Sequence, residues 1–285
     1  MISNILNILK FYIQLIKVPQ TGLLLFTGFA GYMSSVKNID SLLLTNSLVG
    51  LLLVISGTTA LNMVFDKDID HIMARTKKRP IPKKKVSPKA ATIFGIILIV
   101  GGSILNYRIS IPFLIVVLAG TFFDLVIYTI WLKRRSPWSI VFGGLAGGMP
   151  ILAGRVLAIG NVDLIGLLLA CSIVMWIPTH ILTLAMNYSD DYHLAGVPTF
   201  PNVFGFIKAR YFIAVSNILS AVIFISIFIL LNIEPVGFYI SLAGSLLLLI
   251  LSFKMIIQTD EKSNKLLFKY ASIYMFVLML ILVLK

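Results

Sequence analysis

Acidic, amide and basic side chains gather between residues 62 and 82 of this 285-residue chain. Asn62, Asp66 and Asp70 are spaced four residues apart, so a helix through this segment places all three on one face. Four bases follow at once: Arg75, Lys77, Lys78 and Arg79. Carboxylates beside cations suit a metal ion that bridges to an anionic substrate.

A second polar segment repeats part of this spacing. Asn187 precedes Asp191 by four residues, as Asn62 precedes Asp66. Mg²⁺ usually keeps several waters and binds one or two carboxylates together with substrate phosphates. Two facing stripes would therefore suit a Mg²⁺-diphosphate, with metal ligands expected at Asp66, Asp70, Asn187, Asp190 and Asp191. The alternative is that these acids are solvated helix ends among interfacial bases.

Basic side chains near the same segments are candidates for contacting the phosphate oxygens, because guanidinium and ammonium groups are common phosphate binders. The expected diphosphate site comprises Asn62, Arg75, Arg79, Lys133 and Arg134. The residues expected to take part directly in catalysis are Asp66, Asp70, Lys133 and Asp191.

A diphosphate at the mouth of an apolar cavity suggests an allylic lipid substrate. Ionisation of such a substrate leaves a carbocation, which metal charge at the leaving group and nearby aromatic faces would stabilise. Candidate rings are Phe65, Phe122, Phe123, Tyr128 and Trp176. Most aromatic residues at helical spacing in a bundle are simply packing, so each ring is individually a better candidate for the core than for catalysis.

His180 follows Trp176 by four residues and Pro178 by two. A proline inside a helix bends it and opens the local backbone. A histidine there could meet a flat aromatic ligand or an iron ion, although a lone buried histidine is more often hydrogen-bonded structure.

Membrane helices are the elements that must position these residues. The chain is 59% hydrophobic and 12% charged, with a mean hydropathy of +0.99, whereas soluble domains average about 25% charged residues. The expected fold is all-α, a single multi-pass domain over residues 1–285 around a central apolar cavity. Apolar runs of spanning length predict nine helices, near 14–36, 41–65, 90–107, 111–131, 138–158, 164–187, 207–231, 236–257 and 267–284. The repeated spacing suggests four-helix halves at about 14–131 and 138–257.

The basic residues predict the orientation of these helices. If the N-terminus lies inside, all but four of the 24 lysines and arginines lie on the inner side, as the positive-inside rule requires. The C-terminus is then outside, and both acid-rich loops open to the cytoplasm. The net charge of +13 follows from this topology, so nucleic-acid binding is not required. The short tails favour a prokaryotic plasma membrane.

Three stretches resemble the UbiA-type intramembrane prenyltransferases. The first is the motif Asn62-x3-Asp66-x3-Asp70, with Arg-Thr-x2-Arg-Pro after it. The other two run over residues 128–150 and 176–201 and, within that superfamily, are similar to the protoheme IX farnesyltransferases, or heme O synthases. Ile151 stands where that family often has a second proline, and the second motif offers Asn187-x3-Asp191 in place of a full Asp-x3-Asp.

The resemblance implies a reaction and its participants. A farnesyl group would pass from farnesyl diphosphate to a vinyl group of heme B in the lipid bilayer, with Mg²⁺ at the diphosphate and water completing the side chain of heme O. Trp176 and His180 would lie in a segment tied to the porphyrin. Heme A synthase or a terminal oxidase would be candidate partners.

Other functions stay open at this point. Another UbiA-type enzyme, acting on a quinone precursor or an archaeal glycerophosphate lipid, would share Asp66 and Asp70. A transporter also uses buried acids and broken helices, but its sites lie near the bilayer midplane, whereas these acids gather at the inner surface. A non-catalytic assembly factor would need neither carboxylate.

Overall fold

A computed structural model of the chain describes residues 2–36 and 38–285. Every regular element in these ranges is a helix, which confirms the expected all-α membrane fold. Eight helices in the described ranges are long and apolar enough to cross a bilayer. They are α3 (Ser41–Phe65), α5 (Pro88–Ile109), α6 (Ile111–Thr121) continued by η1 (Phe122–Leu132), α7 (Ser139–Ile159), α8 (Leu164–Asn187), α11 (Phe206–Leu230), α12 (Pro235–Ile257) and α13 (Glu261–Leu284).

The expected first membrane helix is divided. α1 (Ile2–Leu15) precedes α2 (Val18–Met33), and Lys17 between them has a φ of +48°. This left-handed conformation interrupts the helix, and Pro19 in the first turn of α2 starts a new one. α2 has 16 residues, fewer than the roughly 20 of a typical span. The structure therefore has eight long candidate spans and this shorter helix where the sequence predicts nine spans.

Capping residues set most of the other boundaries. α3 and α8 begin and end where the sequence predicts. α13 begins at Glu261 rather than near residue 267, because the Asp260 side chain accepts the Ser263 N–H at 2.7 Å and caps the helix there. Similar caps start other helices in the described ranges, at Asp40, Ser87, Ser110 and Asp163.

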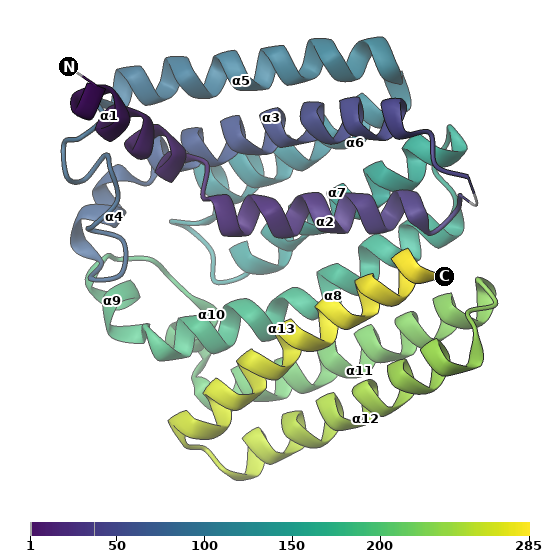
Figure 1. Cartoon of the computed structure of the whole chain (residues 1–285). Helices are drawn as coiled ribbons and strands as arrows, with labels where there is room; N and C mark the ends of the chain where they lie inside the picture. The colour runs from purple at the N-terminus through teal and green to yellow at the C-terminus, as the bar shows by residue number, and fades with distance from the viewer. Residues whose placement is uncertain (1, 37) are drawn as a thin grey trace.

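The helices form a closed bundle. α3 packs on α5, α2 on α7, α7 on α8 and α8 on α11, while α13 returns to contact both α8 and α2 (Figure 1). The chain therefore brings α2 into contact with α13, its last candidate span.

Both acid-rich segments lie at one end of this bundle. The short helices α4 (Lys67–Ile72) and α9 (Ser189–Leu194) lie there, at the same end as the start of α1, whereas the C-terminus lies at the opposite end (Figure 1). A third short helix, α10 (Phe200–Phe204), leads into α11. The assignment of this end to the cytoplasmic side stays a prediction.

Arg155 ties the opposite end together. Its guanidinium donates two 2.7 Å hydrogen bonds to Asp163, which lower the pKa of that carboxyl. It also donates to the Ser34 hydroxyl at 2.9 Å, and Lys285 Nζ donates to the Ser34 carbonyl at 3.0 Å. These contacts join α7, α2, the start of α8 and the C-terminus. A buried charge is thus fully engaged in closing the bundle.

Gly31→Ala is expected to destabilise the protein by about 1–3 kcal/mol, because overpacking forces the backbone to move. A Cβ at Gly31 would lie 2.0 Å from the Ile151 carbonyl oxygen of α7. Gly22, on the same helix, has open space around it. Gly22→Ala is therefore the matched control and should be neutral or slightly stabilising. Thermal unfolding of the detergent-purified proteins measures both, and equal midpoints for the two variants would contradict the close approach of α2 and α7.

Candidate functional site

The first polar stripe lies at the junction of α3 and α4. The Asp66 N–H donates to the Asn62 carbonyl at 3.0 Å, and the Asp70 N–H donates to the Asp66 carbonyl at 2.8 Å. Helical hydrogen bonding thus continues through the junction and keeps the three residues in register, as their spacing predicts. The two aspartates are 1% and 2% exposed. Carboxylates buried this deeply require partners.

Each of these carboxylates is paired with a base from another segment. Lys133 Nζ lies 2.5 Å from Asp66 Oδ2. Arg79 Nη1 donates to both oxygens of Asp70, at 2.8 and 2.7 Å. Two of the expected carboxylates and two of the expected bases are therefore in direct contact.

Arg134 makes a different contact from the one that its motif predicts. It forms a two-point ion pair with Asp68, the acid that lies off the stripe. That hydrogen-bonded pairing lowers the pKa of Asp68 to about 2. Both side chains are exposed, at 41% and 58%, so the pair lies on the rim of the cluster and Arg134 contacts neither stripe carboxylate.

One oxygen of Asp66 fits a metal ion. Oδ1 is buried and has no hydrogen-bond partner among the described residues, which is unusual for a carboxylate. Mg²⁺ binds in this manner when substrate phosphates and waters supply its other ligands. No three acidic, histidine or cysteine side chains converge in ranges 2–36 and 38–285, so the protein alone would supply only part of the coordination.

Lys133 reaches Asp66 from the end of a π-helix. In η1 each turn closes on the fifth residue, so the Lys133 N–H donates to the Tyr128 carbonyl at 2.8 Å. The Thr129 hydroxyl likewise reaches back to the Asp124 carbonyl at 2.7 Å. This winding brings Lys133 Nζ to 5.5 Å from the centre of the Tyr128 ring. In an α-helix, residues five apart would not share a face.

The charge on Lys133 is favoured despite its surroundings. Burial alone would lower the pKa of this lysine, but Tyr128 and the hydrogen-bonded Asp66 carboxylate outweigh that effect and raise it. Lys133 is therefore held as a cation facing the first motif.

Lys17 joins the cluster, although its position in the sequence carried no distinct signal. One lysine at the start of an apolar run is also what the positive-inside rule alone predicts. Its Nζ donates to Asn62 Oδ1 at 3.0 Å, and Asn62 Nδ2 donates to the Thr129 hydroxyl at 2.8 Å. Burial, with a smaller effect of Arg79, lowers the pKa of Lys17 to about 8. The break between α1 and α2 thus places a cation beside the first motif.

A pocket of about 310 Å³ opens beside this cluster. Its lining contains four bases and no acid, which suits an anionic ligand. Lys17 and Arg79 connect it to Asn62 and Asp70 through the contacts given above. The lining residues are Gln14, Lys17, Met63, Arg75, Lys78, Arg79 and Pro80. Lys17 and Lys78 are additions to the ligands expected from the sequence.

The second polar segment meets the first through Asp191. Its Oδ2 accepts the Arg75 N–H at 3.4 Å, a long contact. The Arg75 guanidinium also lies 5.7 Å from the centre of the Tyr188 ring, and Tyr192 packs against the small apolar cluster of Ile69 with Met73. The two segments are therefore neighbours, as their shared spacing suggests.

The remaining residues of the second motif point elsewhere. Asp190 is exposed. Asn187 Oδ1 accepts a 2.6 Å hydrogen bond from Asn264 Nδ2 of α13. Of the three metal ligands expected in this segment, Asp191 alone contacts the first acid-rich loop in the described structure.

Trp176 and His180 form an aromatic stack between α8 and α13. The ring centres of Trp176 and His180 are 5.3 Å apart, and those of His180 and Phe268 are 4.6 Å apart. Trp176 Nε1 donates to the Ala271 carbonyl at 2.8 Å. His180 Nδ1 is buried and has no partner among the described residues. An imidazole nitrogen without a hydrogen-bond partner can bind a metal ion, such as the iron of a porphyrin.

The sequence matches the UbiA prenyltransferase family over residues 23–280. The chain belongs to this family. A protoheme IX farnesyltransferase from Archaeoglobus fulgidus is 38% identical over 267 residues, which cover 93% of each chain. The protein of the same name from Thermofilum pendens is 35% identical over 96% of this chain and 98% of the relative. The resemblance deduced from the motifs is therefore confirmed.

Solved structures show the same UbiA-type fold. A structure of digeranylgeranylglyceryl phosphate synthase has a TM-score of 0.81 at 22% identity and covers 97% of this chain and 98% of its own. A UbiA homolog from Archaeoglobus fulgidus bound to DMAPP and Mg²⁺ has a TM-score of 0.71 at 14% identity, with coverage of 93% and 99%. At these identities the likeness establishes the fold.

Lys17→Met is expected to raise stability most near pH 7. The pKa of Lys17 is lowered from 10.5 to about 8, so below that pH the folded state carries the cost of a partly buried charge. Between about pH 8 and 10.5 the unfolded chain holds the proton more tightly, and stability therefore rises with pH. The difference in thermal midpoint between the variant and the wild type should shrink over this window.

Lys10→Met provides the control, because Lys10 is an exposed residue of α1. Its difference from the wild type should stay constant with pH. If the difference for Lys17→Met were equally constant, the proposed burial of this charge would be wrong.

Proposed function

We propose that this protein transfers a farnesyl group from farnesyl diphosphate to a vinyl group of heme B, producing heme O and releasing diphosphate. The observation that carries the proposal is the 35–38% identity to protoheme IX farnesyltransferases over 90–96% of the chain. The paired carboxylates and bases beside an anion-suited pocket supply the chemistry that diphosphate release requires.

Diphosphate would bind in the base-lined pocket. Arg75 and Arg79 supply planar donors for phosphate oxygens, and Lys17 supplies a point charge at the Asn62 side. Lys133 faces the same cluster through Asp66. Positive charge on these groups stabilises the departing diphosphate as the allylic C–O bond breaks. Arg134, already paired on the rim, would contribute at the outer edge.

Mg²⁺ is the proposed cofactor, and when bound it neutralises charge on the leaving group. Asp66, with its unpartnered oxygen, and Asp70 are the principal residues proposed to hold it. Asp191 is the proposed ligand from the second segment, with Asn187 and Asp190 as its neighbours. UbiA homolog structures bound to DMAPP and Mg²⁺ and to GPP and Mg²⁺ support Mg²⁺ as the cofactor.

Ligand binding would exchange the partners of the buried charges. Lys133 and Arg79 now neutralise Asp66 and Asp70. Phosphate oxygens would attract the two bases while the carboxylates turn to the cation. Each buried charge keeps a partner throughout, which avoids the large cost of an unpaired buried ion.

The acceptor is proposed to lie toward Trp176 and His180. Their stacked rings and the unpartnered His180 nitrogen suit a planar, metal-bearing ring. The vinyl carbon attacks the farnesyl carbon that loses diphosphate, and water adds to the cation left on the former vinyl group with loss of a proton. The Tyr128 ring offers an aromatic face on the diphosphate side.

The wider setting is part of the same proposal. The chain would form one prenyltransferase domain over residues 1–285, with four-helix halves at about 14–131 and 138–257. It would lie in a prokaryotic plasma membrane with the N-terminus and the site facing the cytoplasm and the C-terminus outside. Heme A synthase or a terminal oxidase would be its partners.

Asp66→Asn should lower heme O formation by about 100-fold or more, because it removes charge from a proposed metal ligand. Asp68→Asn is the matched control two residues away, and it should retain most activity because Asp68 pairs only on the rim. Product is measured chromatographically from membranes supplied with farnesyl diphosphate, heme B and Mg²⁺. A chelator should stop the wild-type reaction, and added Mg²⁺ should restore it. Near-normal product from Asp66→Asn would refute the metal assignment.

His180→Ala should weaken use of heme more than use of farnesyl diphosphate. The stack with Trp176 and Phe268 is lost, together with the unpartnered ring nitrogen. We expect the KM for heme B to rise by about 10-fold, equal to about 1.4 kcal/mol of binding, with the KM for farnesyl diphosphate unchanged. His180→Phe, which keeps the stack but not the nitrogen, separates the two contributions. An effect confined to farnesyl diphosphate would place the acceptor elsewhere, and prenylation of 4-hydroxybenzoate without heme O would overturn the proposed function.

A further inference from the structure

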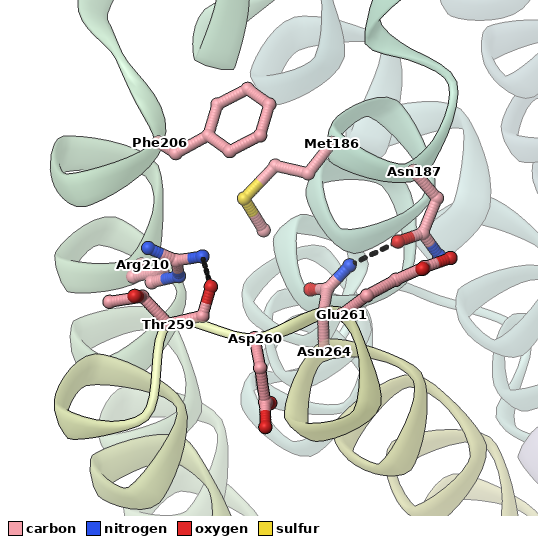
Figure 2. Close-up of a pocket in the computed structure, with 8 residues that line it drawn as sticks. All are labelled: Met186, Asn187, Phe206, Arg210, Thr259, Asp260, Glu261 and Asn264. Carbon is pink, nitrogen blue, oxygen red and sulfur yellow. Dashed lines mark hydrogen bonds between the residues drawn. The ribbon is translucent and has the colours of Figure 1, made fainter.

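A second pocket lies at the same end of the bundle, between α8, α11 and α13. It has a volume of about 280 Å³ and shares no lining residue with the pocket beside Asp66. Polar and apolar side chains both face it (Figure 2). Those used below are Met186, Asn187, Phe206, Arg210 and Asn264.

Arg210 is the buried cation of this pocket. The residue is 7% exposed, and Nη2 donates to the Thr259 carbonyl at 3.0 Å. Its Nε is buried and has no hydrogen-bond partner among the described residues. A guanidinium N–H that is buried and unused costs free energy unless a ligand accepts it.

Asn264 provides the opposite chemistry. Its Nδ2 donates to Asn187 Oδ1 at 2.6 Å and to the Thr183 carbonyl at 3.0 Å. The Thr183 backbone carbonyl can only accept, so this hydrogen bond fixes which end of the Asn264 amide is nitrogen. Oδ1 is therefore an acceptor, and it is buried with no donor among the described residues, in a residue only 4% exposed.

The acids on the rim are already engaged. Asp260 caps α13 and points away from Phe206 and Met186 in Figure 2. Glu261 forms an ion pair with Lys265 at 2.5 Å. Two hydrogen-bonding atoms of the pocket therefore lack partners among the described residues, the Nε–H donor of Arg210 and the Oδ1 acceptor of Asn264.

We propose that this pocket binds the headgroup of a membrane phospholipid whose phosphate carries a nearby ammonium or hydroxyl donor. The phosphate accepts from Arg210, and the donor meets Asn264 Oδ1. An acyl chain has an apolar surface to follow next to the pocket, because Phe206, Ile207 and Ile257 are 38%, 65% and 80% exposed. These residues lie at the ends of α11 and α12, at the level where spanning helices meet headgroups.

The test measures the thermal midpoint of the full-length, delipidated protein in detergent with added lipid. Phosphatidylethanolamine or phosphatidylglycerol, at about ten times the half-saturating concentration, should raise the midpoint by about 3–6 °C. Phosphatidylcholine has the phosphate but no donor on its trimethylammonium group, so its shift should be less than about half as large. Inorganic phosphate and glycerol phosphate should give no shift, because they lack the acyl chains.

Arg210→Gln should remove most of the phosphatidylethanolamine shift, and Asn264→Leu should make the responses to phosphatidylethanolamine and phosphatidylcholine equal. Lys208→Gln removes the same charge from an exposed position on the same helix and should leave the shift unchanged. If Arg210→Gln folds poorly, native mass spectrometry of Asn264→Leu and of the wild type compares retained lipid directly.

Three outcomes would overturn the proposal. Equal midpoint shifts with phosphatidylcholine and phosphatidylethanolamine would show that the headgroup donor does not contribute to binding. A full shift with inorganic phosphate alone would make the site one for a free anion. A shift produced by heme B but by no phospholipid would assign the pocket to a different ligand.

Discussion

Two carboxylates buried at the end of an apolar bundle are the constraint on which the rest of the structure depends. Asp66 and Asp70 cannot remain charged there without partners. Lys133 follows η1 and Arg79 lies in the loop after α4, so each base reaches its carboxylate from outside α3. The π-helix before Lys133 and the turns after Asp70 bring these two bases to the carboxylates. Guanidinium and ammonium groups are also common phosphate binders, so the bases that stabilise these carboxylates have the chemistry to contact a diphosphate.

Much of the fold could be predicted because a helix that spans a membrane needs a run of about 20 apolar residues, which the sequence shows directly. The bounds of α3 and α8 agree with the sequence prediction, and helical register brings Asn62, Asp66 and Asp70 into line. The missed features depend on backbone detail that periodicity does not encode. The left-handed Lys17 divides the first helix, and the π-helical winding of residues 122–132 changes which side chains share a face. Both features place cations beside the first motif.

The second motif shows why equal spacing does not imply equal contacts. Asn62 and Asn187 each precede an aspartate by four residues. Asn62 accepts from Lys17, a cation at the pocket beside Asp66, whereas Asn187 accepts from Asn264, which makes a second hydrogen bond to the Thr183 carbonyl. The sequence could not predict this difference because the partners lie 45 and 77 residues away from the two asparagines.

This difference gives the two polar segments distinct surroundings. Four bases surround the pocket beside the first segment, where an anion lowers their mutual repulsion. The second segment joins the end of α8 to α13, and beyond that contact α9 brings Asp191 back toward Arg75. The position of Asp191 therefore depends on how firmly α8 and α13 are held together at their polar ends. A ligand that joins Arg210 to Asn264 would strengthen that same joint between α8 and α13.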